Sequence, residues 1–176
     1  ASAFDGSDLT GFVLPDTSTV DFLLPNGDVI VNASSNISLT YAVSAPGKNI
    51  ILDARGTGHT VTIDRDVSTG TTGMFAATAS NNVAVQSSGQ VTAGQVALTA
   101  GNSILMAANS IVDSDIDGIK FASNSAGNNA GVISIAGDAT INSHGGNITL
   151  SSSNTVTSAG QINTSGSATH HAAGNV

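Results

Sequence analysis

The sequence predicts an all-β protein whose short strands are wound into a parallel β-helix, a form of β-solenoid. Three observations lead to this fold class: short apolar pulses recur at a steady cadence, turn-forming residues separate them, and aromatic residues make up only 3% of the chain. The pulses are too short and too often broken by glycine for an amphipathic helix. Ile, Val and Thr that alternate with polar residues are typical of strands instead.

The pulses are clearest between residues 132 and 166. Their central apolar residues, which advance by six to eight positions, are Ile133, Ile141, Ile148, Val156 and Ile162. Three such pulses per coil would give a repeat of roughly 20 to 23 residues, which is typical of solenoids. Coils stacked about 4.8 Å apart would place each Ile or Val above its counterpart in one continuous core. An antiparallel β-sandwich is the alternative, because short strands with regular turns also fit it, although a sandwich core normally takes larger residues.

Residues 1–48 differ from the rest and are predicted to form an N-terminal capping region. All three prolines lie there, together with four of the aromatic residues: Phe4, Phe12, Phe22 and Tyr41. Large side chains cover the open end of a solenoid core better than Thr or Ala does. The β-solenoid body is expected to span residues 49–166, and residues 167–176 are expected to be a flexible tail or a truncated end.

Within the body, two strands are expected at 50–53 and 60–64, and the Thr, Gly, Ala and Ser residues of 68–81 predict a loop or an irregular coil. Further pulses with the same cadence lie at 83–85, 90–92, 96–98, 104–106, 110–112 and 119–121. The Ser, Asn and Gly residues of 124–131 predict a longer loop that leaves the coil.

Charge and cysteine content narrow the function classes. Charged residues make up 9% of the chain, and the formal net charge is -8 with no basic patch. This balance argues against nucleic acid and anionic membrane as partners. The chain has no cysteine, which excludes disulfides and thiolate metal sites. No apolar run reaches 18 residues, so no membrane span is expected.

The most specific local motif runs from Asp113 to Gly118 and matches the opening of a calcium-binding loop, D-x-[DN]-x-[DN]-G. Asp113, Asp115 and Asp117 could turn toward one cation, with the backbone carbonyl of Ile119 as a further ligand. The twelfth position is Asn124 and not Glu, so an EF-hand is not expected. The sequence therefore predicts a candidate calcium site, with an acidic solenoid turn as the alternative and no other cofactor.

Catalysis is not expected. Asp53, Asp64 and Asp66 form the tightest carboxylate group on strands, but they lie among arginines and the body lacks aromatic sugar platforms. The four histidines, His59, His144, His170 and His171, show no metal-ligand spacing. The T-x-T pulses at 60–62 and 155–157 resemble ice-binding solenoids, but Ser, Asn and Asp replace Thr in most other pulses.

The repeat pattern also carries a resemblance to a known family. The stretch from Gly146 to Gly166, and the stretch from Val96 to Ile104, are similar to the repeats of filamentous-haemagglutinin-like bacterial exoproteins. This resemblance, over residues 83–166, implies a right-handed β-helix, export to the bacterial surface or medium, and a rod that presents an adhesive region.

The predicted function is therefore a structural and adhesive segment of a secreted bacterial surface protein, a rod for display and attachment without catalysis. Its expected partner is a glycan or protein on a host or neighbouring cell. The alternatives are a subunit of a self-assembling extracellular fibre, whose partners are other copies of itself, and a polysaccharide-active β-helix enzyme.

Overall fold

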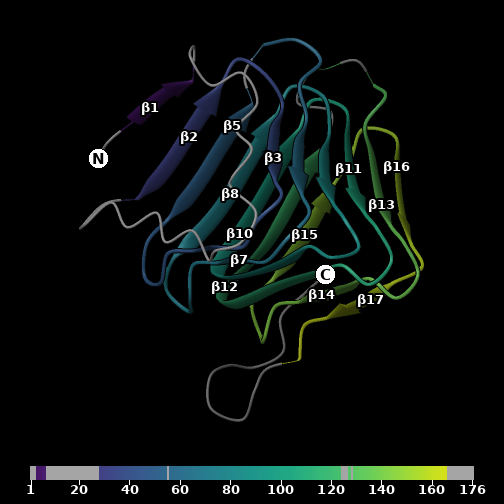
Figure 1. Cartoon of the computed structure of the whole chain (residues 1–176). Helices are drawn as coiled ribbons and strands as arrows, with labels where there is room; N and C mark the ends of the chain where they lie inside the picture. The colour runs from purple at the N-terminus through teal and green to yellow at the C-terminus, as the bar shows by residue number, and fades with distance from the viewer. Residues whose placement is uncertain (1–2, 7–27, 55, 124–126, 128, 166–176) are drawn as a thin grey trace.

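The computed structural model describes residues 3–6, 28–54, 56–123, 127 and 129–165. These residues form strands and turns, and none of them lies in a helix (Figure 1). Accordingly, the described ranges contain no helix that is long and apolar enough to cross a membrane. Every strand pair among these residues is parallel. The predicted parallel β-solenoid is confirmed, and the antiparallel sandwich is wrong.

The strands stack into three faces, and six successive coils each contribute one strand segment to every face. The first face contains β2 (Val29–Ala33), β5 (Ile50–Ala54), β8 (Met74–Ala79), the second half of β10 (Gln90–Ala100), the second half of β12 (Ile111–Ser123), and β15 (Ile148–Ser151). The second face contains β3 (Ile37–Leu39), β6 (Val61–Ile63), β9 (Val83–Val85), β11 (Ser103–Met106), β13 (Val132–Ile135) and β16 (Thr155–Ser158). The third face contains β4 (Val43–Ser44), β7 (Val67–Ser68), the first halves of β10 and β12, β14 (Thr140–Asn142) and β17 (Gln161–Asn163).

From β2 onward, partner residues in most pairs of adjacent coils are 21 to 25 positions apart, close to the predicted repeat. For example, Val61 pairs with Val83, and Val83 pairs with Ile104. One coil is longer: Ile104 pairs with Ile133, 29 positions on. The additional residues fall in the Ser, Asn and Gly segment between β12 and β13, where the sequence predicts a longer loop.

The core is built from rows of like side chains that continue from coil to coil. On the second face, the residues of one inward row are each at most 1% exposed: Ile37, Val61, Val83, Ile104 and Ile133. Each such side chain contributes about 1.5–3 kcal/mol when removed from water. Where the first face turns toward the second, the inward row consists of small side chains: Ala33, Ala54, Ala79, Ala100 and Ser123. Branched residues therefore fill the middle of the faces, and small residues fill this narrow corner.

The irregular coil predicted at 68–81 is wrong for residues 74–79, because β8 is a regular strand of the first face. Its inward residues Phe75, Ala77 and Ala79 are all at most 1% exposed. Phe75 fills the space between its row partners Ile50 and Val96, and alanine suffices beside the corner. Alanine has little intrinsic strand preference, so sequence pattern alone did not mark this strand.

The N-terminal part of the described chain belongs to the stack. Strands β2, β3 and β4 pair in register with β5, β6 and β7, so residues 28–48 form a coil like those that follow. Tyr41 packs against the core from this coil. β1 (Ala3–Gly6) adds to the free edge of β2. The remaining residues of the predicted cap, including Phe12 and Phe22, and the predicted tail at 167–176 lie outside the described residues.

Candidate functional site

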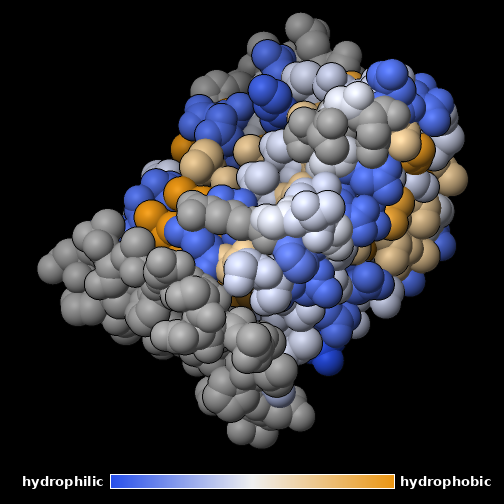
Figure 2. Space-filling view, turned by 90° about the horizontal axis from the view of Figure 1, so that it is seen from above, coloured by the Kyte–Doolittle hydropathy of each residue, from blue (hydrophilic) through white to orange (hydrophobic). Residues whose placement is uncertain are grey.

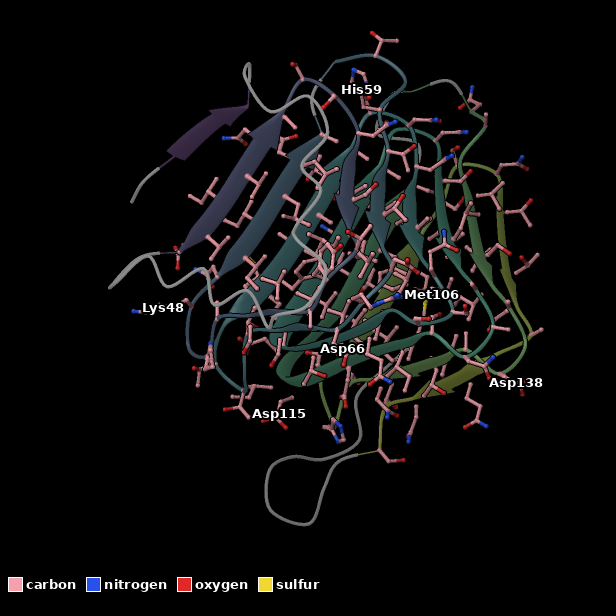
Figure 3. All side chains as sticks on the ribbon, in the orientation of Figure 1. Lys48, His59, Asp66, Met106, Asp115 and Asp138 are labelled. Carbon is pink, nitrogen blue, oxygen red and sulfur yellow. The ribbon has the colours of Figure 1, made fainter. Side chains whose placement is uncertain are left out.

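The best candidate site lies at the corner where the chain passes from the third face to the first. In Figure 3, His59, Asp138 and Asp115 mark three different corners of the coil, and Asp115 marks this one. β10 and β12 both continue through the corner. Their pairing shifts register here, because Ala93 pairs with Ser114 whereas Gln95 pairs with Gly118. The three residues 115–117 therefore bulge outward, and they are the centre of the acidic motif.

Ser114 is fully buried inside this corner. Its Oγ lies 2.8 Å from the carbonyl oxygen of Gly94 and 3.0 Å from that of Gly118. The same arrangement occurs in two other coils, where Thr69 Oγ1 donates to the Gly73 carbonyl at 2.8 Å and Ser143 Oγ donates to the Gly146 carbonyl. A buried hydroxyl that satisfies a glycine carbonyl is thus a repeated way to close this corner, and the acidic motif contains one copy of it.

Gly118 has a geometric reason to be glycine. Its φ is +90°, a region that side-chain-bearing residues rarely adopt, and a Cβ there would lie 2.2 Å from the carbonyl oxygen of Asn147. In the next coil, a Cβ on Gly146 would lie 2.6 Å from the Gly118 nitrogen. The two glycines let successive coils approach closely at the corner. The glycine of the predicted calcium motif therefore has a structural use of its own.

Asp113 faces outward from β12 and meets a histidine of the following coil. His144 Nε2 lies 2.8 Å from Asp113 Oδ1, and the Asp113 side chain is 29% exposed. His144 itself occupies a turn with a positive φ of 43°. Burial raises the pKa of Asp113 above its ordinary value, His144 opposes this rise, and nearby Asp115 adds to it. The sequence did not pair these residues, because His144 comes into reach only through the coil register.

The structure does not bring the predicted calcium ligands together. Asp113 pairs with His144, Asp117 is exposed, and Ile119 is buried in the core. The Ile119 N–H donates to the Asn147 carbonyl at 2.9 Å. Among the residues with described positions, no three histidine or acidic side chains cluster closely enough to hold a metal ion. Calcium binding by Asp113, Asp115, Asp117 and the Ile119 carbonyl stays a prediction.

The other group of carboxylates, formed in the sequence by Asp53, Asp64 and Asp66, is also dispersed over the fold. Asp53 lies on β5 of the first face, whereas Asp64 and Asp66 lie between β6 and β7, at the corner of the second and third faces. Asp64 forms an exposed ion pair with Arg65 at 3.5 Å. An exposed pair of this kind contributes about 0–1 kcal/mol.

The T-x-T pulses do not form a threonine plane on the part of the second face that the structure describes. β6 and β16 carry these pulses, and three coils separate them. The outward residues of the intervening strands, in the row of Thr62 and Thr157, are Ala84, Leu105 and Ser134. His170 and His171 lie outside the described residues.

A hollow of 170 Å³, lined by both polar and apolar residues, opens on the first face beside the glycine corner. Polar residues of β10, β12, β15 and their turns line it: Gln95, Asp117, Lys120, Asn147 and Thr149. No local sequence pattern links these residues, because they are spread over three coils. The coil period is the signal that could have found them, since Ala97, Lys120 and Thr149 occupy one outward row.

No family model matches the chain, and no curated protein or solved structure matches it. The resemblance to filamentous-haemagglutinin-like exoproteins therefore stays a prediction.

Proposed function

We propose that this chain is a structural and adhesive segment of a secreted bacterial surface protein, a rod that displays and attaches without catalysis. One observation carries the proposal: the six coils share a single core, whose first-face row runs from Val29 to Ile148. A core that continues through every coil suits a rod, because each coil is supported by its neighbours.

Backbone hydrogen bonding supports stiffness. The faces are parallel ladders, and bonds between neighbouring coils also close the corners, as from Val61 N to the Asn82 carbonyl and from Gln86 N to the Ile63 carbonyl. Side chains add similar bonds at the corners: Asn49 Nδ2 donates to Asp28 Oδ2, and the Met74 N–H donates to Asn49 Oδ1. Bending such a column would break bonds in several coils at once.

The outer surface is suited to contact with other molecules in water. Figure 2 shows hydrophilic and weakly polar residues over most of the visible described face, with the most hydrophobic residues in separate patches. Large apolar residues that are exposed among the described residues include Leu105, Ile116 and Val156, and they lie on different coils. Flat polar faces can hold a partner through many weak contacts, which suits attachment.

An adhesion assay tests the proposal. Beads coated with the purified chain should attach to bacterial or host cells more strongly than beads coated with an unrelated globular protein of equal negative charge. The same preparation should leave soluble polysaccharides at their original chain length. Failure to attach to any cell surface, together with progressive cleavage of a polysaccharide, would instead support the enzymatic alternative.

The second candidate, a subunit of a self-assembling fibre, is favoured by the last described coil. Val156 continues an inward row but is 44% exposed, and the inward residues Leu150 and Ile162 are only partly buried. Residues 148–165 also contain no charged side chain that would discourage edge-to-edge pairing. Sedimentation over a range of concentrations tests this candidate, since end-to-end assembly requires species that lengthen with concentration and that a Val156→Lys substitution shortens.

A further inference from the structure

We propose that the hollow on the first face, which is lined by both polar and apolar residues, is a subsite for one residue of a neutral oligosaccharide. This inference rests on the proposed attachment role and assigns that role to a particular surface and ligand class. The hollow is lined by Gln95, Asp117, Lys120, Asn147 and Thr149, with Val96, Ala97, Gly118 and Ile119 completing it.

The shape of the hollow follows from small residues in its floor. Ala97 projects little from the sheet, and Gly118 has no side chain. Gly118 cannot readily gain one, because its Cβ would meet the Asn147 carbonyl. Around this floor, the exposed bulge ending at Asp117 forms one side, and Lys120 and Thr149 project from neighbouring strands. The depression is therefore fixed by the backbone path of the corner.

Its hydrogen-bonding groups match a ligand rich in hydroxyls. Lys120 supplies donors, Asp117 supplies acceptors, and the Thr149 hydroxyl and the Gln95 amide supply both. One cation and one anion balance each other locally. An acidic ligand would be repelled by Asp117 and by the net charge of -8, whereas a cationic ligand would be repelled only locally, by Lys120. A neutral ligand encounters neither repulsion.

The volume suits a single sugar residue. Its 170 Å³ is well below the roughly 300–1,000 Å³ of sites that enclose drug-sized ligands. The adjoining outward positions, two residues further along each strand, are small: Thr99, Ala122 and Ser151. The face beyond the hollow is thus flat, so the rest of a chain-like ligand can lie across it.

Titration of the isotope-labelled chain with cellotetraose, laminaritetraose, maltotetraose and chitotetraose, followed by amide NMR, tests the inference. At least one neutral tetrasaccharide should cause saturable shifts at Gly118, Lys120 and Thr149. Lys120→Ala and Gln95→Ala, both at exposed positions, should each weaken that binding by about fivefold or more, as expected for one lost hydrogen bond. Lys48→Ala, an exposed lysine in another coil, is the matched control and should leave the affinity unchanged.

The outcome separates this inference from the proposed function. Absence of saturable shifts with all four neutral sugars overturns the subsite, and so does exclusive binding of tetragalacturonate, an acidic probe. If beads coated with Lys120→Ala or Gln95→Ala attach to cells as well as wild type, attachment stands and its assignment to this subsite fails. If sugar binding occurs and no coated bead attaches to any cell, the subsite stands and the adhesive role fails.

Discussion

The middle coils and the last described coil have the same sequence cadence but differ in how well they are buried. In the row that contains Val83, Ile104 and Ile133, all three side chains have 0% exposure, whereas Val156 at the end of that row is 44% exposed. The residues are chemically alike, so the difference comes from their neighbours: a middle residue is covered by a coil on each side. Stability in this fold therefore depends on a residue's position in the stack more than on its type.

The largest expected effect compares two leucines of one row. Leu98 is fully buried in the middle of the stack, and Leu150 is partly buried in the last coil. Leu98→Ala should lower the free energy of unfolding by about 3–4 kcal/mol, because it removes buried contacts and leaves a cavity, whereas Leu150→Ala should cost about 1 kcal/mol. Urea denaturation measures both values. Equal losses would show that position in the stack does not control burial energy.

The second largest loss of stability is expected from a substitution at Gly118, in the corner between the third and first faces. Gly118→Ala forces a Cβ toward the Asn147 carbonyl at a positive φ, and we expect it to cost about 2–3 kcal/mol. Gly137 lies in another turn where an added Cβ meets nothing within 4 Å, so Gly137→Ala should change stability by less than about 0.5 kcal/mol. Thermal unfolding of the two variants checks this, and a harmless Gly118→Ala would contradict the close approach of the coils.

A smaller effect is expected for the buried hydroxyls of the same corner. Ser114→Ala removes the hydroxyl that contacts the carbonyls of Gly94 and Gly118, and we expect it to cost about 1–2 kcal/mol. Ser134→Ala, on the outward side of β13, should be nearly neutral. Matched losses in the two variants would show that the corner hydroxyls contribute no more than surface serines.

The smallest effect depends on pH. Burial raises the pKa of Asp113 in the folded protein, so its contribution to stability is fully present below the ordinary value of 3.8 and is lost as the pH rises through the raised pKa. Asp113→Asn should therefore raise the Tm at neutral pH, with a gain of less than about 1 kcal/mol in the free energy of unfolding. This gain should vanish below pH 4. Asp115→Asn removes the same charge two residues away and therefore controls for the change in net charge. A destabilising Asp113→Asn at pH 7 would mean that the contact with His144 outweighs burial.

The pKa of Asp28 is shifted in the opposite direction to that of Asp113. The N–H and side-chain amide of Asn49 donate to its carboxylate and lower its pKa, so its stabilising contribution is present above 3.8 and is lost as the pH falls through the lowered value. Asp28→Ala should reduce the Tm at neutral pH, and the difference from wild type should shrink on acidification. A constant difference across this range would exclude an ionised Asp28 as the acceptor.

Much of the fold follows from the sequence, because the inward residues of a solenoid are visible as local pulses. The centres Ile133, Ile141, Ile148, Val156 and Ile162 all lie on strands, β13 to β17 in order. β8 was missed because its inward alanines carry little strand signal. The continuity of β10 and β12 through the corner was missed because each appears as two pulses separated by small or acidic residues.

The candidate site was less predictable, because it depends on which residues lie above one another. The motif at 113–118 predicted carboxylates around one cation, but the register places Asp113 against His144, 31 positions further on. The register of that coil could not be counted in advance, since it is lengthened by the segment before β13. The same coil register places Lys120 and Thr149 in one row, and no local sequence pattern links these two residues.

Spin-label distances along one outward row test the parallel stack most directly. The chain has no native cysteine, so single cysteines can be placed at Thr157 and, in separate variants, at Ala84, Thr62 or Ser38, which are three, four and five coils away. With about 4.8 Å between coils, stacking in register predicts backbone separations of about 14, 19 and 24 Å, rising evenly with coil number. Separations that fail to increase in this order would contradict the stacked coil.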